Sequence, residues 1–437
     1  MTPVTGEPTA VPSLWSSSAF RRLWRANAVS TFGSEISELA IPLLALGSLS
    51  ASGAELSIIR SAGFLPFLLA TIPLGLLADS RRRLPLMVIA DAGRFALLTA
   101  IPVAVWLGVA SVPLVAALVF AAGCLTVLYE TSSFSVLPDI VAPEQLVDAN
   151  AKLTATESGM TISGGGIAGL LVQTVTAPVA VLVDAASFLV SGLTLRRIRI
   201  NEAEHATSEG STWHEALAGV SLVGRSRALR ALAGEAATWN AANELYVLGL
   251  TLLVVRDRDL GAAVLGAALT AGGAGTFIGA WYGTRVSSRV GYGHALVGAL
   301  LIGNTAPLLV AISPRSTPAF VTLLVGASIL SGLGVGVANS HAVSVRQLAV
   351  PDELRARANA GYRLISWGAI PIGAASAGIL VTALGARPTL AIGAGGMALA
   401  TLWIAASPLR RLQSVGDAAA ADALTTTSTS NGNRDMP

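Results

Sequence analysis

Two apolar stretches of the sequence carry acidic and amide side chains that suit proton or cation binding. Glu35 and Glu38 are three residues apart, so a helix places them on neighbouring faces. Asn240, Asn243 and Glu244 follow i, i+3, i+4 spacing, which predicts a polar stripe along one helical face. A carboxyl group in such surroundings can carry a proton or attract a cationic substrate, although packing or an interface position can also account for it. We take these five residues as candidates for a proton or substrate site.

The composition indicates that lipid surrounds most of these stretches. Hydrophobic residues make up 53% of the 437 residues and charged residues only 12%, whereas soluble domains carry about 25% charged residues. The basic residues are almost all Arg, and positions at membrane edges account for them without a nucleic-acid partner. We find neither metal-ligand spacing nor a phosphate-cradling GxxxxGK[ST] motif. No metal, no other cofactor and no ATP-driven pumping is therefore expected.

About twelve segments are long and apolar enough to cross a bilayer as helices, for which roughly 20 residues are needed. This predicts an all-α polytopic membrane protein. The expected spans are 26–50, 56–78, 85–108, 112–136, 153–175, 178–195, 231–254, 260–284, 293–312, 318–345, 360–384 and 388–406.

The arginines predict how these spans are oriented. When alternate loops are assigned to opposite sides, most basic residues fall on the side that also holds both termini. The positive-inside rule then places both termini in the cytoplasm, for a multi-pass protein of the inner (plasma) membrane. The opposite side receives only Arg60, Arg256, Arg258, Arg315 and Arg387.

A polar stretch that occurs twice indicates an internal duplication. "SVLPDIVAPEQLVDANA" starts at position 135 and "SVRQLAVPDELRARANA" at position 344, which is 209 residues later. The same offset relates Glu35 to Glu244. Two pseudo-symmetric six-helix bundles of equal orientation are predicted, an architecture of secondary transporters. The expected domains are a cytoplasmic tail (1–20), a first bundle (21–195), a linker with an interfacial helix (196–230), a second bundle (231–408) and a disordered tail (409–437).

Charges near the predicted cytoplasmic side suggest contacts that form or break between conformations. The first copy of the repeated loop is acidic and the second is basic, so Asp148 and Arg357 are expected to attract each other across the halves. Glu130 and its repeat mate Asn339 are expected to line the inner vestibule. Other charged residues lie within the spans. Asp91 and Arg94, at i, i+3 spacing, are expected to pair on one helix face.

Four stretches resemble the major facilitator superfamily, and within it the drug and siderophore exporters of the macrolide-efflux and enterobactin-exporter type. They are "FRRLW" (20–24), "GLLADSRRRLPLMVIADAGR" (75–94), "YETSSFSVLPDIVAPEQLVDANAKLTATES" (129–158) and "VDAASFLVSGLTL" (183–195). The resemblance covers residues 20–408. Two departures stand out: Ser80 replaces the Arg that usually follows the Asp, and the fourth span carries no Arg.

The resemblance implies roles for further residues. Gly75, Asp79 and Arg83 match the loop between the second and third helices, where the Asp is expected to bias the equilibrium between two conformations; the arginines can also be simple membrane anchors. The first and seventh helices are expected to line a central cavity. Helices five and eight are expected to face each other across the halves through closely spaced glycines, although ordinary tight packing is the alternative. These glycines are Gly165, Gly169, Gly275 and Gly279.

Three classes of function remain in view. The first is a monomeric secondary transporter that exports a small hydrophobic or amphipathic compound at the expense of a proton gradient, with export resting on the resemblance. The second is an importer of the same architecture. The third, an integral-membrane enzyme, is disfavoured because no nucleophile with a base in reach is evident.

Overall fold

The computed structural model describes residues 13–142, 145–200, 213–348, 350 and 352–414, and every secondary-structure element within them is a helix. The first half of the chain forms α1–α7. Their bounds are α1 Ser18–Ser48, α2 Gly53–Leu69, α3 Thr71–Ser80, α4 Arg83–Trp106, α5 Val112–Val136, α6 Leu146–Val175 and α7 Ala177–Leu195.

The second half forms α8–α15. Their bounds are α8 Trp213–Arg225, α9 Arg227–Leu252, α10 Ala262–Val290, α11 Tyr292–Thr305, α12 Pro307–Ala311, α13 Thr317–Leu348, α14 Asp352–Leu384 and α15 Ala386–Ala405. A π-helical turn, Leu253–Asp257, extends α9, and a short 3-10 turn, η5 (Pro408–Arg411), follows α15. The helix α8 lies in the linker and packs against α14, where Gly361 approaches the backbone of Gly219.

Proline accounts for the two broken spans. The pair α2–α3 bends by 54° at Ala70, because Pro73 lacks the N–H that would bond to the Leu69 carbonyl and its ring crowds that group. Pro307 likewise starts α12 directly after α11. Counting α2–α3 and α11–α12 as one span each, the described residues form twelve spanning units, as predicted.

Not all twelve units are equally apolar. By length and composition alone, nine described helices, or ten if the bent pair is one span, can cross a membrane. The other two units are α6 and α9. Both carry polar residues within the bundle, among them Glu157 on α6 and Asn240, Asn243 and Glu244 on α9, and such residues commonly mark functional surfaces in membrane proteins.

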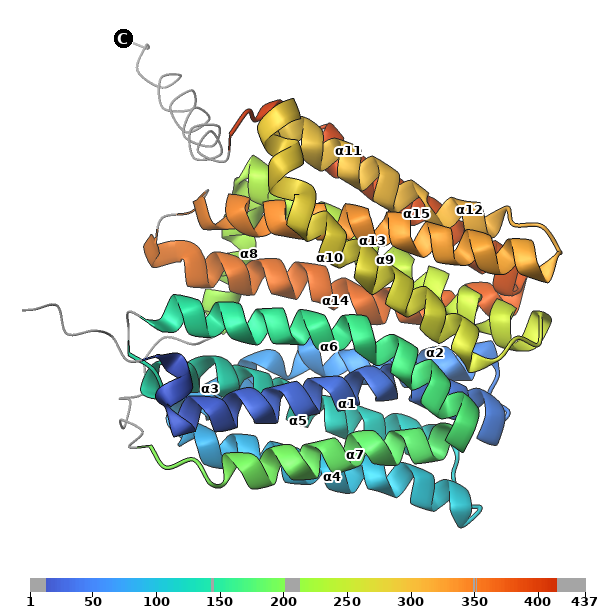
Figure 1. Cartoon of the computed structure of the whole chain (residues 1–437), viewed down its shortest axis with the longest axis horizontal. Coiled ribbons are helices and arrows are strands. Elements are labelled where there is room, and N and C mark those ends of the chain that lie inside the picture. Colours follow the sequence, from blue (N-terminus) through green and yellow to red (C-terminus); the bar gives the residue numbers. More distant parts are fainter. Residues whose placement is uncertain (1–12, 143–144, 201–212, 349, 351, 415–437) are drawn as a thin grey trace, which may run out of the picture.

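The two halves repeat each other in their helix boundaries. The helices α1, α2, α4 and α7 begin 209 residues before α9, α10, α11 and α15, respectively, and α6 ends 209 residues before α14. The halves lie one above the other in Figure 1, with α6 and α14 adjacent in that view. Across the halves, α2 packs on α14 and α6 packs on α10.

The halves share a hydrophobic core at one end of the molecule. We call this the closed end, and it contains the α1–α2 turn (49–52) and the π-helical turn Leu253–Asp257. There, buried Leu46 and Ala51 join Val254 and Leu265 of the other half in one cluster. At the opposite end, which carries the arginines at 81–83, 196–199 and 225–230 and is called the arginine-rich end, each hydrophobic cluster belongs to one half. The described halves therefore close on each other at one end.

Candidate functional site

A cavity of about 450 Å³ lies between the two halves. Its wall is built from α1, α2 and α6 of the first half and from α9, α10, α12, α13, α14 and α15 of the second. Most lining side chains are apolar, such as Leu39, Leu248 and Met397, while a few charged and amide groups converge on the space. Pockets of roughly 300–1,000 Å³ with this character hold drug-sized ligands.

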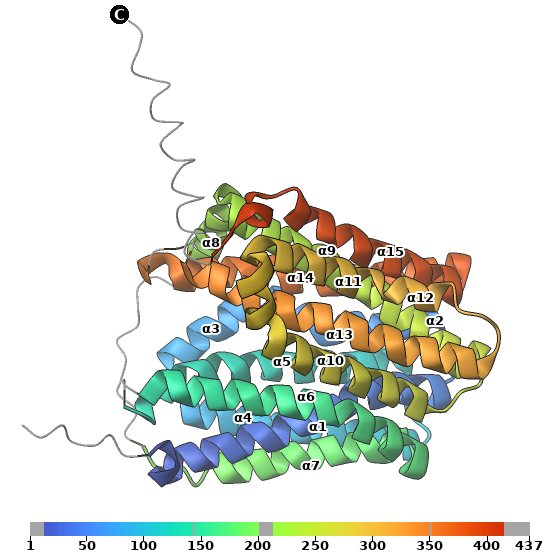
Figure 2. The same cartoon turned by 45° about the horizontal axis from the view of Figure 1, so that its top comes forward.

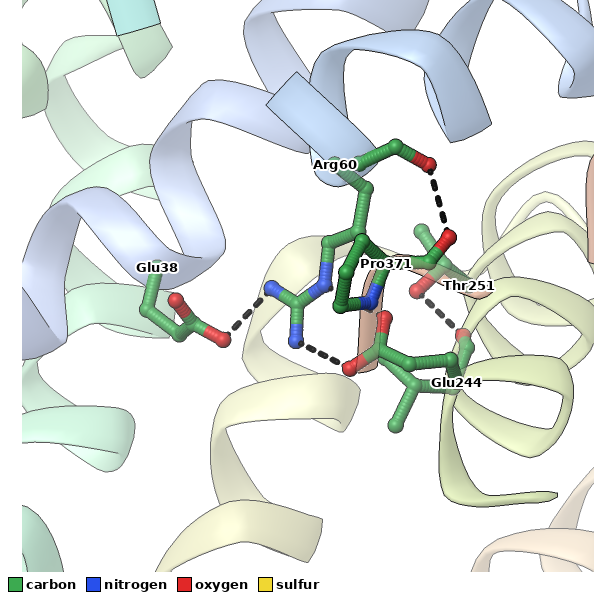
Figure 3. Close-up of polar contacts among 7 residues, drawn as sticks. Glu38, Arg60, Glu244, Thr251 and Pro371 are labelled. Atoms are coloured by element: carbon green, nitrogen blue, oxygen red, sulfur yellow. Dashed lines mark hydrogen bonds and ion pairs between the residues drawn. The ribbon is translucent and has the colours of Figure 1, made fainter. Parts of the chain in front are cut away.

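Three charged residues from three helices meet at this cavity. Arg60 of α2 donates from Nη1 to Oε1 of Glu38 on α1, at 2.5 Å. It also donates from Nε and Nη2 to the two carboxylate oxygens of Glu244 on α9, at 2.8 and 3.1 Å. Figure 3 shows the guanidinium lying between the two carboxylates. Since α2 and α9 belong to different halves, this bidentate ion pair joins the halves directly.

Burial differs sharply between the two carboxylates. The Glu244 side chain is 5% exposed and the Arg60 side chain 18%, whereas that of Glu38 is 49% exposed. A buried carboxylate that loses its partner leaves an uncompensated charge at high cost. Arg60 and Glu244 therefore depend on each other, while Glu38 remains accessible from the cavity.

Of the other cavity candidates, some line the cavity and one lies outside it. Glu35 and Asn243 line the cavity, as Glu38 and Glu244 do. The Thr161 hydroxyl donates to Glu35 at 2.8 Å, which ties α6 to α1 within the first half. Asn240 lies outside the lining, where its amide donates to the Ser366 carbonyl of α14 at 2.7 Å.

Arg60 is the central residue that the sequence did not reveal. The charge count placed it at the outer membrane edge, but it lies two turns inside α2 and its charge is neutralised by two acids. The prediction was wrong because an arginine near a span end is normally read as an interfacial anchor. A signal was present, since two acids on α1 and one on its repeat mate needed a basic partner within the membrane.

Asp91 and Arg94 form the ion pair predicted from their spacing. Both are buried inside the first half, and the Arg94 guanidinium lies 4.4 Å from the centre of the Tyr129 ring and 4.1 Å from that of Phe188. The pair thus connects α4 to α5 and α7. A smaller cavity of about 260 Å³ runs from Arg94 to Arg60 and Glu38 inside the first half.

The repeated polar loop forms contacts within the first half. Arg83, at the start of α4, pairs with Asp139 of the first loop copy at 3.3 Å. Asp148 pairs with Lys152 on its own helix at 3.1 Å. The side chain of its expected partner, Arg357, lies outside the described residues, so the contact between the loop copies stays a prediction.

The remaining gate and vestibule candidates lie on α3, α5 and α13. Gly75 lies within α3, where an added Cβ would meet open space. The side chain of Asp79, also on α3, lies outside the described residues. Glu130 pairs with Arg363 of α14 at 3.1 Å, a contact between the halves at the arginine-rich end. Its repeat mate Asn339 is exposed on α13.

Glycines bring α6 and α10 into backbone contact across the halves. A Cβ added at Gly169 would lie 2.9 Å from the Cα of Gly266, and one added at Gly165 would lie 2.6 Å from the Leu269 Cβ. These two α6 glycines face α10, but the expectation that α10 meets α6 through its own Gly275 and Gly279 was wrong. Gly275 and Gly279 face α13 instead, where added Cβ atoms would lie 2.3 and 2.2 Å from backbone carbonyl oxygens. Four-residue spacing alone does not say which neighbour a glycine face meets.

The sequence of residues 11–429 matches the MFS_3 family, described as transmembrane secretion effector. The chain belongs to this family. The match spans both halves and their linker, so this MFS_3 chain is a transporter of the major facilitator type, in agreement with the expected superfamily. No curated protein resembles it in sequence.

Solved transporter structures share the fold of this MFS_3 chain. A bacterial homologue of the iron transporter ferroportin, in its inward-facing state, gives a TM-score of 0.71 at 16% identity, covering 90% of this chain and 99% of that one. The nucleoside transporter NupG gives 0.71 at 12% identity, covering 89% and 98%. A bacterial homologue of the human lysosomal transporter Spinster gives 0.66 at 14% identity, covering 93% and 98%.

Proposed function

We propose that this transporter exports a small hydrophobic or amphipathic compound by alternating access, driven by the inward flow of protons. It would act as a monomer in the inner (plasma) membrane with both termini in the cytoplasm. The observation that carries the proposal is the ion pair of Arg60 with Glu244 at the wall of the inter-half cavity.

The cavity wall supports the class of substrate. Leu39, Leu248, Leu265 and other apolar side chains supply most of the lining, so an apolar body is accommodated by burial rather than by many hydrogen bonds. Polar side chains such as Thr161, Asn243 and Ser331 also line the cavity, but apolar surface predominates, which favours an apolar compound over a sugar. The half-exposed carboxylate of Glu38 can attract a positive charge on the compound.

The same ion pair supports coupling to protons. To open the closed end, the halves must part, and Glu244 must then leave Arg60. That step leaves a buried anion unless a proton neutralises it. Protonation of Glu244 therefore favours separation at the closed end, while deprotonation favours the paired arrangement. In this scheme Glu38 holds Arg60 while Glu244 is released.

Substrate release by whole cells tests the proposal. Cells expressing the chain, loaded with the lipophilic cation ethidium, are expected to hold less dye than cells with Glu244→Gln. A protonophore should abolish the difference. Higher dye content in the wild type would indicate import, and equal content across ethidium and a panel of apolar drugs would contradict the substrate class.

A further inference from the structure

A groove lined by four arginines lies on the outer side of the second half, at the arginine-rich end. Its volume is about 860 Å³, between the first turn of α9 and the end of α15. Its arginines are Arg227, Arg230, Arg410 and Arg411, all of them exposed.

The groove is held in shape by the backbone around η5. Leu409 is buried among residues of α9, α11 and α15, and the N–H of Gly293 donates to the Leu412 carbonyl at 2.8 Å. An added Cβ at Gly293 would lie 2.3 Å from the Leu409 carbonyl oxygen, so the turn and α11 touch backbone to backbone. Arg410 and Arg411 therefore project from a fixed turn.

A second groove occupies the corresponding place in the first half. It lies between the start of α1 and the end of α7, with a volume of about 690 Å³. Buried Ile198 anchors the segment that carries its arginines. They are Arg22, Arg196, Arg197 and Arg199. Because α1 and α7 are the repeat mates of α9 and α15, the two grooves are related by the pseudo-symmetry of the fold, and Figure 2 shows α7 and α15 at opposite edges of the molecule.

Each groove continues into an apolar surface. Beside the arginines of the second half, Leu399 and Leu402 on α15 are 61% and 59% exposed, and Trp403 forms part of the same wall. Leu193 of α7 is exposed beside the other groove. These side chains belong to helices that are long and apolar enough to span a membrane. We therefore expect them to face acyl chains, with the arginines at the level of the lipid headgroups.

Within the part of the chain that the structure describes, the arginines of both grooves have no acidic partner. Among the described residues, none of the eight lies within ion-pair distance of a carboxylate, and the groove linings contain no acid. Three of them donate to backbone carbonyls: Arg230 to Gly224, Arg410 to Ala405 and Arg22 to Arg197. Guanidinium groups held in this way keep N–H donors directed to a ligand.

We propose that each groove binds one anionic phospholipid, with the arginines on its headgroup phosphate and its acyl chains along α15 or α7. Arginine forms bidentate bonds to phosphate oxygens, and basic pockets at the inner leaflet recognise anionic headgroups. Arginines that only fix the orientation of the protein in the membrane need no particular arrangement, because the positive-inside rule depends on charge alone. Here, each groove is concave, has arginines from two segments of the chain and continues into an apolar wall. This arrangement fits both the headgroup and the acyl chains of a lipid, and it occurs at symmetric places in the two halves.

Native mass spectrometry of the delipidated full chain, titrated with phosphatidylglycerol or phosphatidylcholine, tests the proposal. We expect two phosphatidylglycerol molecules to bind in preference to phosphatidylcholine. Arg410→Gln with Arg411→Gln should weaken the binding of one of them by roughly fivefold for each arginine lost. Arg196→Gln with Arg199→Gln should independently weaken the binding of the other to a similar extent.

The matched control is Arg285→Gln with Arg289→Gln. These exposed arginines on the last turns of α10 lie at the same end of the molecule but outside both grooves. The control should retain both lipids. Equal loss in all three double variants would show a diffuse surface charge effect and overturn the proposal, as would equal binding of the two lipids by the wild type.

Discussion

Arg60 and Glu244 join the two halves of the transporter by two hydrogen bonds of 2.8 and 3.1 Å. Glu244 is the repeat mate of Glu35, yet the two carboxylates have different partners. Glu35 accepts from Thr161 within its own half, whereas Glu244 reaches across to Arg60. The duplicated scaffold thus has one acid that ties a half together and one that ties the halves to each other.

Removing the charge of Glu244 should open the closed end. We expect Glu244→Gln to shift the ratio of the two conformations by roughly tenfold or more, because hydrogen bonds to charged groups contribute about 1.5–3 kcal/mol. Spin labels at Ser48 and Ser316, on opposite halves near the closed end, should report a longer distance in a Cys124→Ser background. Glu35→Gln is the control and should leave that distance unchanged. An unaltered distance in Glu244→Gln would refute the tie between the halves.

The exposed acid, Glu38, should matter for coupling more than for folding. Its carboxylate is 49% exposed to the cavity, so Glu38→Gln should insert and fold normally but lose the acceleration of transport by an imposed pH gradient. Ethidium transport in proteoliposomes with and without the gradient measures this. Retention of full acceleration by Glu38→Gln would rule out a coupling role for this acid.

The close backbone contact between α6 and α10 should not tolerate an added methyl group. A Cβ at Gly266 would lie 2.8 Å from the Gly165 carbonyl oxygen, so Gly266→Ala should push the helices apart and lower transport several-fold. Gly159→Ala on α6 is the control, since nothing lies within 4 Å of its Cβ. Helix propensity alone favours both changes by up to about 1 kcal/mol. Normal transport by Gly266→Ala would show that α6 and α10 can separate enough to accommodate the methyl group without loss of function.

The buried pair of Asp91 and Arg94 should stabilise the first half. Arg94→Ala leaves Asp91 buried without its partner, at a cost of about 3–5 kcal/mol. Thermal unfolding in detergent should therefore show a clearly lowered melting temperature, whereas Arg285→Ala, at an exposed site, should leave it within about a degree. An unchanged melting temperature for Arg94→Ala would mean that the pair contributes little to the fold.

The sequence was sufficient for most of the fold. Apolar length predicted the twelve units, and the repeated loop predicted that the second six would copy the first. Local spacing also predicted the Asp91–Arg94 pair. These features depend on hydrophobic length and on neighbours along one helix, which a sequence states directly.

Contacts between helices were harder to predict. The pairing of Arg60 with Glu244 joins positions 184 residues apart, and Gly275 and Gly279 pack against α13 rather than α6. Such choices depend on helix rotation and on which half supplies the neighbour, which composition does not encode. The direction of Arg363 toward Glu130 was missed for the same reason.

The backbone contact between α10 and α13 has a mechanical consequence. Added Cβ atoms at Gly275 and Gly279 of α10 would meet carbonyl oxygens of α13, and those at Gly332 and Gly336 of α13 would meet carbonyl oxygens of α10 at 2.0 and 2.1 Å. Because backbone meets backbone at these four glycines, no side chain there can repack, and we expect α10 and α13 to move as one rigid unit. A ligand that displaces α10 at the cavity is therefore expected to move α13 with it, over the whole length of the two helices.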